Sequence, residues 1–283
     1  MRVTIAGFLT DYKGRVLLQQ PEPGRLSPVA ASLESGVLPA DTLAGAFRTA
    51  TGLVIWPVRL VGVYFIARRG GELVLTYRCT LRGGELQPPP EQPPAAFFDT
   101  TPRPHGLSAA HARQLDDALG HIGGPAIVAR LGGGLWPGLR RPKKSQAAGA
   151  LDWAVTTRLI VGGGHGQVAW TRGEAAEPWR LPSAAVRPGE APWATAERLR
   201  RTLQLDGNGH RPVPRLITQA TDRPALTFVF AAELYEPPFP QDLGDRLGFA
   251  APDRVDARFE AADRALAAEL LTAPDMTLVR LEV

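Results

Sequence analysis

The sequence repeats itself once, at a nearly constant offset. Gly14 and Gly166 lie 152 residues apart, each in a glycine turn between two apolar runs, VTIAGFLTDYKGRVLLQQ from residue 3 and VTTRLIVGGGHGQVAWTR from residue 155. Apolar runs joined by such a turn are typical of a β-hairpin. The segments SGVLP (35–39) and PGEAP (188–192) follow, 153 residues apart. Each ends in a proline that opens a helical stretch, where its missing N–H is harmless.

Two further features recur in both halves. The alternating strands LVLTYRCTL (73–81) and LTFVFAAEL (226–234) are again 153 residues apart, and each half closes on a helix-like stretch, 108–120 and 256–271. A chain of 283 residues is long enough for two domains. The repeat therefore predicts an α/β protein in which a unit of hairpin, loop, helix, strands and helix occurs twice.

The predicted domains cover 1–123 and 152–283. Between them lies a linker, 124–151, rich in Gly, Pro and basic residues, although its front, AIVARL, could still pack on the first domain. Residues 124–150 hold five basic side chains and no acid, so the formal net charge of +4 is concentrated there: Arg130, Arg140, Arg141, Lys143 and Lys144. This favours a solvated linker, with contact to an anionic partner as the alternative, and nucleic acid is not expected as a partner.

Hydropathy, the first residues and the cysteine count indicate where the protein is located and which sites it can form. No apolar run approaches the ~20 residues of a membrane helix, so no membrane partner is expected. The first residues indicate no signal peptide. The single cysteine, Cys79, excludes an internal disulfide and a cysteine-cluster zinc site, and a reducing cytoplasm is the expected location. Cys79 lies mid-strand, where a structural thiol is expected rather than a nucleophile.

In the order of these elements, the chain resembles the Nudix superfamily over nearly its whole length. In that family a loop written roughly WxLPGGxxExGE leads into a helix, REUxEExGU, where U is aliphatic. The second half has Trp179, Leu181-Pro182 and Gly189-Glu190, with Ser183-Ala184 where two glycines are usual. The first half has Glu34, Gly36 and Pro39, and its helix ends in ATGL (50–53), like the family's EETGL without the acids. The resemblance implies two tandem Nudix-like α/β/α sandwiches.

The resemblance also implies a magnesium site that these residues do not supply. Diphosphate cleavage uses magnesium, which prefers hard oxygen ligands, and carboxylates at i, i+3 and i+4 of one helix provide them on one face. The matching positions in the first half are Ala46, Thr49 and Ala50, with Gly45 in place of the family's arginine. In the second half they are Leu199, Thr202 and Leu203, or Arg198, Arg201 and Thr202, depending on the end from which the helix is aligned. We therefore expect no magnesium cofactor.

Four residues near the second loop are the candidates for ligand binding: Trp179, Glu190, Arg198 and Arg201. The arginines suit an anionic small molecule, but they could equally form a solvated helix face, from which Arg200 is turned away. Trp179 could stack on a ring or belong to the core. Glu190 matches a family glutamate, or it could be a cap or surface charge. Four more acids could face the cleft: Glu34, Glu85, Glu91 and Asp99.

Two other patterns have simpler explanations. Gly162 to Gly166 resembles a phosphate loop, but it precedes a strand rather than a helix, so a hairpin turn is predicted. His105, His111 and His121 lack the spacing of a helical metal pair and are expected to be unrelated surface residues.

These observations leave two main hypotheses. The first is a protein that binds a nucleotide-like or phosphorylated small molecule without ordinary Nudix hydrolysis, as a sensor or an inactive partner. The second is a divergent Nudix-family enzyme, which the well-kept second loop favours. A DNA-binding regulator is the least favoured, because no helix-turn-helix pattern is found. The second half is the better candidate for a ligand-binding pocket. The chain could be a monomer with an internal pair of domains, or it could be a homodimer.

Overall fold

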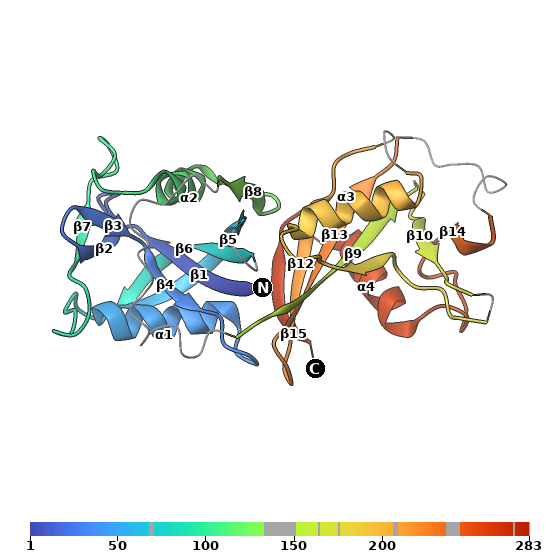
Figure 1. The fold of residues 1–283 in the computed structure, drawn as a ribbon, viewed down its shortest axis with the longest axis horizontal. Helices are drawn as coiled ribbons and strands as arrows, with labels where there is room; N and C mark the ends of the chain where they lie inside the picture. The colour runs from blue at the N-terminus through green and yellow to red at the C-terminus, as the bar shows by residue number, and fades with distance from the viewer. Residues whose placement is uncertain are drawn as a thin grey trace. The chain divides into compact units, whose positions relative to one another are not determined.

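The computed structural model describes residues 1–67, 71–132, 151–163, 165–174, 176–205, 209–235, 244–273 and 275–282. The chain divides into two compact units, drawn in Figure 1. Unit 1 comprises Met1–Trp153, Gln219–Pro224 and Val279–Val283, and unit 2 comprises Ala154–Thr218 and Ala225–Leu278.

Unit 1 is built on a five-stranded mixed sheet. Its strands, in spatial order, are β4 (Val29–Ser32), β1 (Arg2–Leu9), β6 (Glu72–Gly83), β5 (Val54–Ile66) and β8 (Ile127–Leu131). β1 runs parallel to β6, and β5 runs parallel to β8 and antiparallel to β6. A second sheet holds β3 (Arg25–Ser27), β2 (Val16–Glu22) and β7 (Ala95–Phe98). Helices α1 (Pro39–Thr51) and α2 (Ala109–Gly120) cover opposite faces of the larger sheet (Figure 1).

Helix α1 has the limits that its sequence predicts. Pro39 stands at its first turn. Gly52 ends it with a φ of 76° and donates its backbone N–H to the carbonyl of Arg48. A Cβ at Gly52 would lie 2.7 Å from the carbonyl oxygen of Glu85, so only glycine fits here without a shift of backbone.

The second large sheet has seven strands. In spatial order these are β14 (Leu247–Ala250), β10 (Val168–Thr171), β9 (Ala154–Gly162), β13 (Ala225–Glu233), β12 (Val213–Ala220) and β15 (Leu278–Glu282), with β11 (Ser183–Ala185) also pairing with β9. A 3₁₀ turn, η2 (Gly244–Arg246), precedes β14. Helix α3 (Pro192–Thr202) contacts β9 and β11, and α4 (Ala261–Thr272) packs its leucines into a core cluster around Trp170.

The same pairing pattern is found around the central strand of each unit. β1 is parallel to β6 and antiparallel to β4, the strand before α1. β9 is parallel to β13 and antiparallel to β11, the strand before α3. The mixed α/β class predicted from the sequence is confirmed.

Several predicted boundaries need correction. Helix α4 begins at Ala261 and not at 256, because residues 256–259 form a turn and the backbone of Trp179 bonds to Arg258 and Glu260. β8 lies inside the predicted linker 124–151 and completes the sheet of unit 1, as AIVARL allowed. Four of the basic residues predicted to form the linker lie outside the described residues: Arg140, Arg141, Lys143 and Lys144.

Two local predictions can be checked directly. The N–H of Gly163 donates to the carbonyl of Gln167, and β10 pairs antiparallel with β9, so the glycine-rich segment is a hairpin turn as predicted, with Gly164 outside the described residues. Within the described part of the chain, no helix is long and apolar enough to cross a membrane.

Candidate functional site

The α1 positions predicted from the sequence resemblance as metal-ligand positions carry no acid. Ala46 is half-buried, Thr49 is exposed and Ala50 is buried, so the helix offers two methyl groups and one hydroxyl. Among the described residues, no three His, Cys, Asp or Glu side chains come together in a way that could hold a metal ion. The donor set therefore does not fit the magnesium ion that the family resemblance implies.

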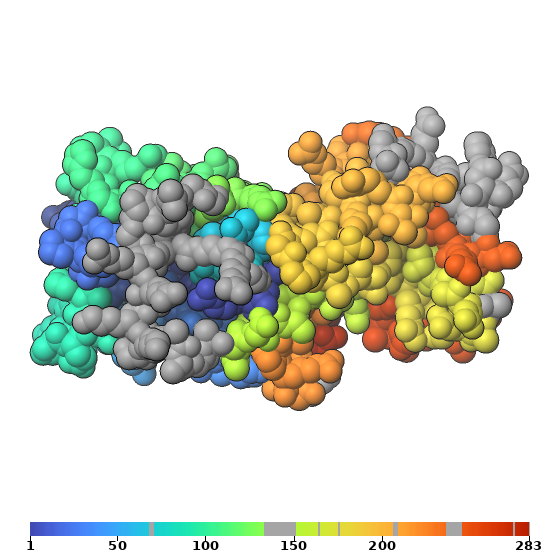
Figure 2. Space-filling model, viewed as in Figure 1, coloured from blue at the N-terminus to red at the C-terminus, as the bar shows by residue number. Residues whose placement is uncertain are grey.

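Helix α3 is basic and lies on the face of unit 2 seen in Figure 2. Arg201 and Thr202 are exposed, and the hydroxyl of Thr202 donates to the carbonyl of Arg198 at 3.0 Å. Arg200 is instead buried, where it donates to the carbonyl of His210 and pairs with Glu197 at 3.2 Å. Arg200 is thus turned away from its neighbours, as helical spacing predicts.

Glu190 and Arg198 bind each other. The Nε of Arg198 lies 3.0 Å from Oε1 of Glu190, and its Nη2 lies 3.0 Å from Oε2. The hydrogen bond from Arg198 holds the pKa of Glu190 below its usual range, and the hydrogen bond to Glu190 raises the pKa of Arg198. This two-point contact joins the loop to α3, so the loop glutamate and the helix arginine neutralise each other.

Trp179 is held between other side chains. It is half-buried, it stacks on Phe259 with ring centroids 5.9 Å apart, and the guanidinium of Arg172 lies 4.7 Å from its ring centroid. Two residues on, the N–H of Leu181 donates to the buried carboxylate of Asp263 at 2.8 Å. These contacts make Trp179 part of the packing of unit 2, the second of its two sequence interpretations.

The remaining sequence candidates do not gather into a site. Four acids are exposed on the surface: Glu34, Glu85, Glu91 and Asp99. Cys79 is fully buried in β6, and burial raises the pKa of its thiol, as expected of a structural cysteine.

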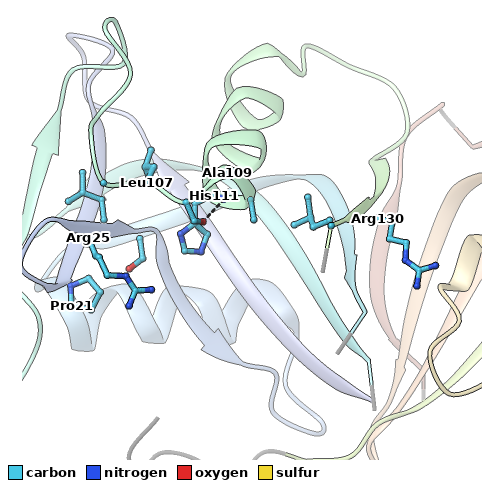
Figure 3. Close-up of a pocket in the computed structure, with 13 residues that line it drawn as sticks. Pro21, Arg25, Leu107, Ala109, His111 and Arg130 are labelled. Carbon is cyan, nitrogen blue, oxygen red and sulfur yellow. Dashed lines mark hydrogen bonds between the residues drawn. The ribbon is translucent and has the colours of Figure 1, made fainter. Parts of the chain in front are cut away.

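A cavity of about 650 Å³ lies in unit 1, on the side of the sheet covered by α2 (Figure 3). Its walls come from β3 and the residue Pro21, from the segment 106–111 that opens α2, and from residues 130–132 at the end of β8. Leu26 and Leu107 belong to one hydrophobic cluster of unit 1, and Ala110 and Leu131 belong to another. The cavity therefore lies between two hydrophobic clusters. Sequence analysis had favoured a pocket in the second half instead.

His111 faces this cavity from the first turn of α2 (Figure 3). The backbone N–H of His111 donates to the hydroxyl of Ser108, which caps the helix. Burial lowers the pKa of the imidazole to about 4, assisted by the positive charge of Arg25. His111 is half-buried at the cavity wall beside β3, rather than an unrelated surface residue as expected. The sequence signal for this site was Ser108, a helix cap three residues before the histidine.

Arg25 and Arg130 are the two cationic side chains that line the cavity. The guanidinium of Arg25 extends from β3 below His111 in Figure 3 and pairs with Glu22 at 2.8 Å. Arg130 lies at the rim, where its guanidinium is 5.5 Å from the Phe65 ring centroid and points away from His111. A mostly apolar wall with two arginines and one neutral imidazole suits a small molecule that has an apolar or aromatic body and an anionic group.

Comparisons with known proteins give structural matches alone. No protein-family model and no curated protein matches the chain. An ADP-ribose pyrophosphatase from Streptococcus suis is 18% identical over 46% of this chain and 98% of its own, with a TM-score of 0.38. A NUDIX hydrolase from Nitrosomonas europaea is 16% identical over 46% of this chain and 78% of its own, with a TM-score of 0.40. A NUDIX-family hydrolase from Clostridium perfringens is 13% identical over 43% of this chain and 97% of its own, with a TM-score of 0.36. At such identities these matches assign no activity to this chain.

Proposed function

We propose that this chain is a tandem Nudix-like protein that binds a nucleotide-like or phosphorylated small molecule and does not perform the magnesium-dependent hydrolysis of that family. The observation that carries the proposal is the chemistry of the two helices. At the family's metal-ligand positions α1 presents Ala46, Thr49 and Ala50, and α3 presents Arg201 and Thr202. Without clustered carboxylates, neither helix can hold a hard dication by itself.

The cavity of unit 1 is the proposed binding site. Its volume of about 650 Å³ falls within the range of small-molecule pockets. Arg25 would pair with a phosphate or another anionic group, since guanidinium binds such groups through paired N–H donors. His111 would meet the uncharged part of the ligand, because an imidazole that stays neutral can donate or accept a hydrogen bond without adding charge.

A divergent enzyme is the weaker candidate. It rested on the second loop and its glutamate, but the Glu190 carboxylate is held by two nitrogens of Arg198 and accepts a bond from the N–H of Arg187. A carboxylate with these three donors and a lowered pKa is a poor general base.

Calorimetry with a panel of nucleoside mono- and diphosphates tests the proposal. Arg25→Ala should weaken binding about tenfold, which is the loss expected for one charge-assisted contact. Glu22→Gln is the matched control, because it breaks the same ion pair but keeps the guanidinium. Binding that is unchanged in Arg25→Ala and in His111→Ala would contradict this site, and magnesium-dependent turnover of the bound compound would contradict the function.

A further inference from the structure

Strands β5 and β6 continue beyond their neighbours as a two-stranded ribbon. β1 pairs with β6 only as far as Cys79, and β8 pairs with β5 only from Gly62. Trp56 is opposite Thr80 within the ribbon, and Arg59 is opposite Arg78 at its base, where β6 still pairs with β1. Partners directly opposite each other point to the same side of a sheet, and alternate residues along a strand do so too. One face of the ribbon therefore carries Arg59, Arg78, Trp56, Thr80 and Arg82.

This ribbon face, defined by those five residues, combines positive charge with an exposed aromatic ring. Trp56 is 55% exposed, and the guanidinium of Arg82 lies 4.4 Å from its ring centroid. Arg78, Thr80 and Arg82 are exposed. Within the described part of the chain, no ion pair includes Arg59, Arg78 or Arg82.

The arrangement is unfavourable for the protein alone. Like charges directly opposite each other in neighbouring strands destabilise a sheet, and Arg59 and Arg78 have this relation. The exposed half of the Trp56 ring also contributes no burial free energy to folding. An anion placed between the two arginines and a flat group placed on Trp56 would offset both effects.

We propose that the ribbon face binds single-stranded nucleic acid. Arg59 and Arg78 would contact phosphates, and an unpaired base would stack on the free part of the Trp56 ring beside Arg82. Proteins that bind single strands without sequence preference combine a basic track with an aromatic platform in this way. An acidic peptide would satisfy the arginines but has no ring in each residue for the tryptophan, so it fits the face less well.

The sequence alone does not indicate such a partner. Its basic segment is 124–150, whereas Arg59, Arg78 and Arg82 lie in two strands that carry no basic run. Only the register of β5 with β6 brings them together. The ribbon face shares no residue with the cavity that carries Arg25, so the two proposals stand or fall independently.

Fluorescence anisotropy of the full chain with a labelled oligothymidylate of about 12 nucleotides tests the inference. Two or three phosphate contacts predict a slope of about −2 for log K against log salt. Trp56→Ala should weaken binding about tenfold, whereas Trp56→Phe, which keeps a ring, should retain most of it.

Removing the phosphate contacts needs a control for charge. Arg59→Ala with Arg78→Ala should lower the affinity and reduce the salt slope by about 1.4. Arg223→Ala with Arg254→Ala, at two exposed positions outside the ribbon face, removes the same charge and should change neither. Equal losses in both double variants, an unchanged affinity in Trp56→Ala, or equal competition by polyglutamate at the same charge concentration would overturn the proposal.

Discussion

At the residue scale, His111 shows how position changes the chemistry of a side chain. It is half-buried on α2 beside β3 and Arg25 is close, so its imidazole stays neutral at a pH where an exposed histidine would be partly charged. The same burial that keeps it neutral makes it a defined wall of the cavity. The positive charges at the cavity therefore come from Arg25 and Arg130, which no change of pH in the physiological range can remove.

The lowered pKa of His111 predicts a pH dependence of stability. The pKa is about 4 in the folded chain and near 6.5 in an unfolded one, so between these values the unfolded state binds more protons. Above pH ~6.5 the imidazole is neutral in both states. As the pH falls toward ~4, the unfolded state gains the proton first, which lowers the free energy of unfolding by up to about 3 kcal/mol. His111→Gln should flatten the pH dependence of the urea midpoint over this range. His105→Gln, at an exposed position, should not, and equal slopes in wild type and His111→Gln would refute the assignment.

At the element scale, the contact of Glu190 with Arg198 fastens a loop to a helix. The loop leaves β11 at Ala185, and Arg198 also donates to the carbonyl of that residue. The start of α3 has no side-chain cap, and this ion pair is one polar link between the helix and the loop before it. The Glu190–Arg198 pair thus holds the loop against α3 through an arginine, where a cluster of carboxylates would need a bound dication.

This link can be tested by exchanging its charges. Arg198→Ala should lower the free energy of unfolding by about 1 kcal/mol, because the pair is only partly shielded from water. Glu190→Arg combined with Arg198→Glu should recover part of the loss. The control is Arg201→Ala on the exposed side of the same helix, for which a change within about 0.5 kcal/mol is expected in urea denaturation. A loss in Arg201→Ala as large as in Arg198→Ala would show that general helix charge, and not the pair, is responsible.

The elements also show how far the sequence could predict the molecule. Pro39 and Gly52 limit α1 through local backbone rules, and the period-two pattern of β6 is local too. Both elements could therefore be predicted from the sequence. The start of α4 could not, because it depends on hydrogen bonds to Trp179, some 80 residues earlier. The cavity was missed for the same reason. Arg25, His111 and Leu131 are distant in sequence, and only the packing of β3, α2 and β8 brings them to one place.

At the scale of the whole molecule, the two units share a strand pattern but differ in detail. Unit 1 contains the cavity, and unit 2 contains the ion pair that joins its loop to α3. The shared strand pattern supports a core in each unit, whereas the polar residues placed on it differ between the units.

The uncharged and basic side chains of α1 and α3 at the proposed ligand positions predict that magnesium does not change the stability of the protein. Adding about 10 mM MgCl₂ should leave the melting temperature within about 1 °C of that in NaCl of equal ionic strength, because a ligand stabilises only the state that binds it. MnCl₂ should behave alike. A saturable rise with either ion, absent with NaCl, would mean that carboxylates from elsewhere in the chain form a site, and the non-hydrolytic proposal would then fail.

Strand β8 has a consequence for how the protein matures. It is the last strand of its sheet in the sequence, it pairs with β5 across some sixty intervening residues, and it brings Leu131 to the cavity. During synthesis the hairpins and α1 emerge first, yet no binding site exists until residue 132 has left the ribosome and its strand has docked. A ligand that enters afterwards would draw the newly made chain toward this finished state by mass action.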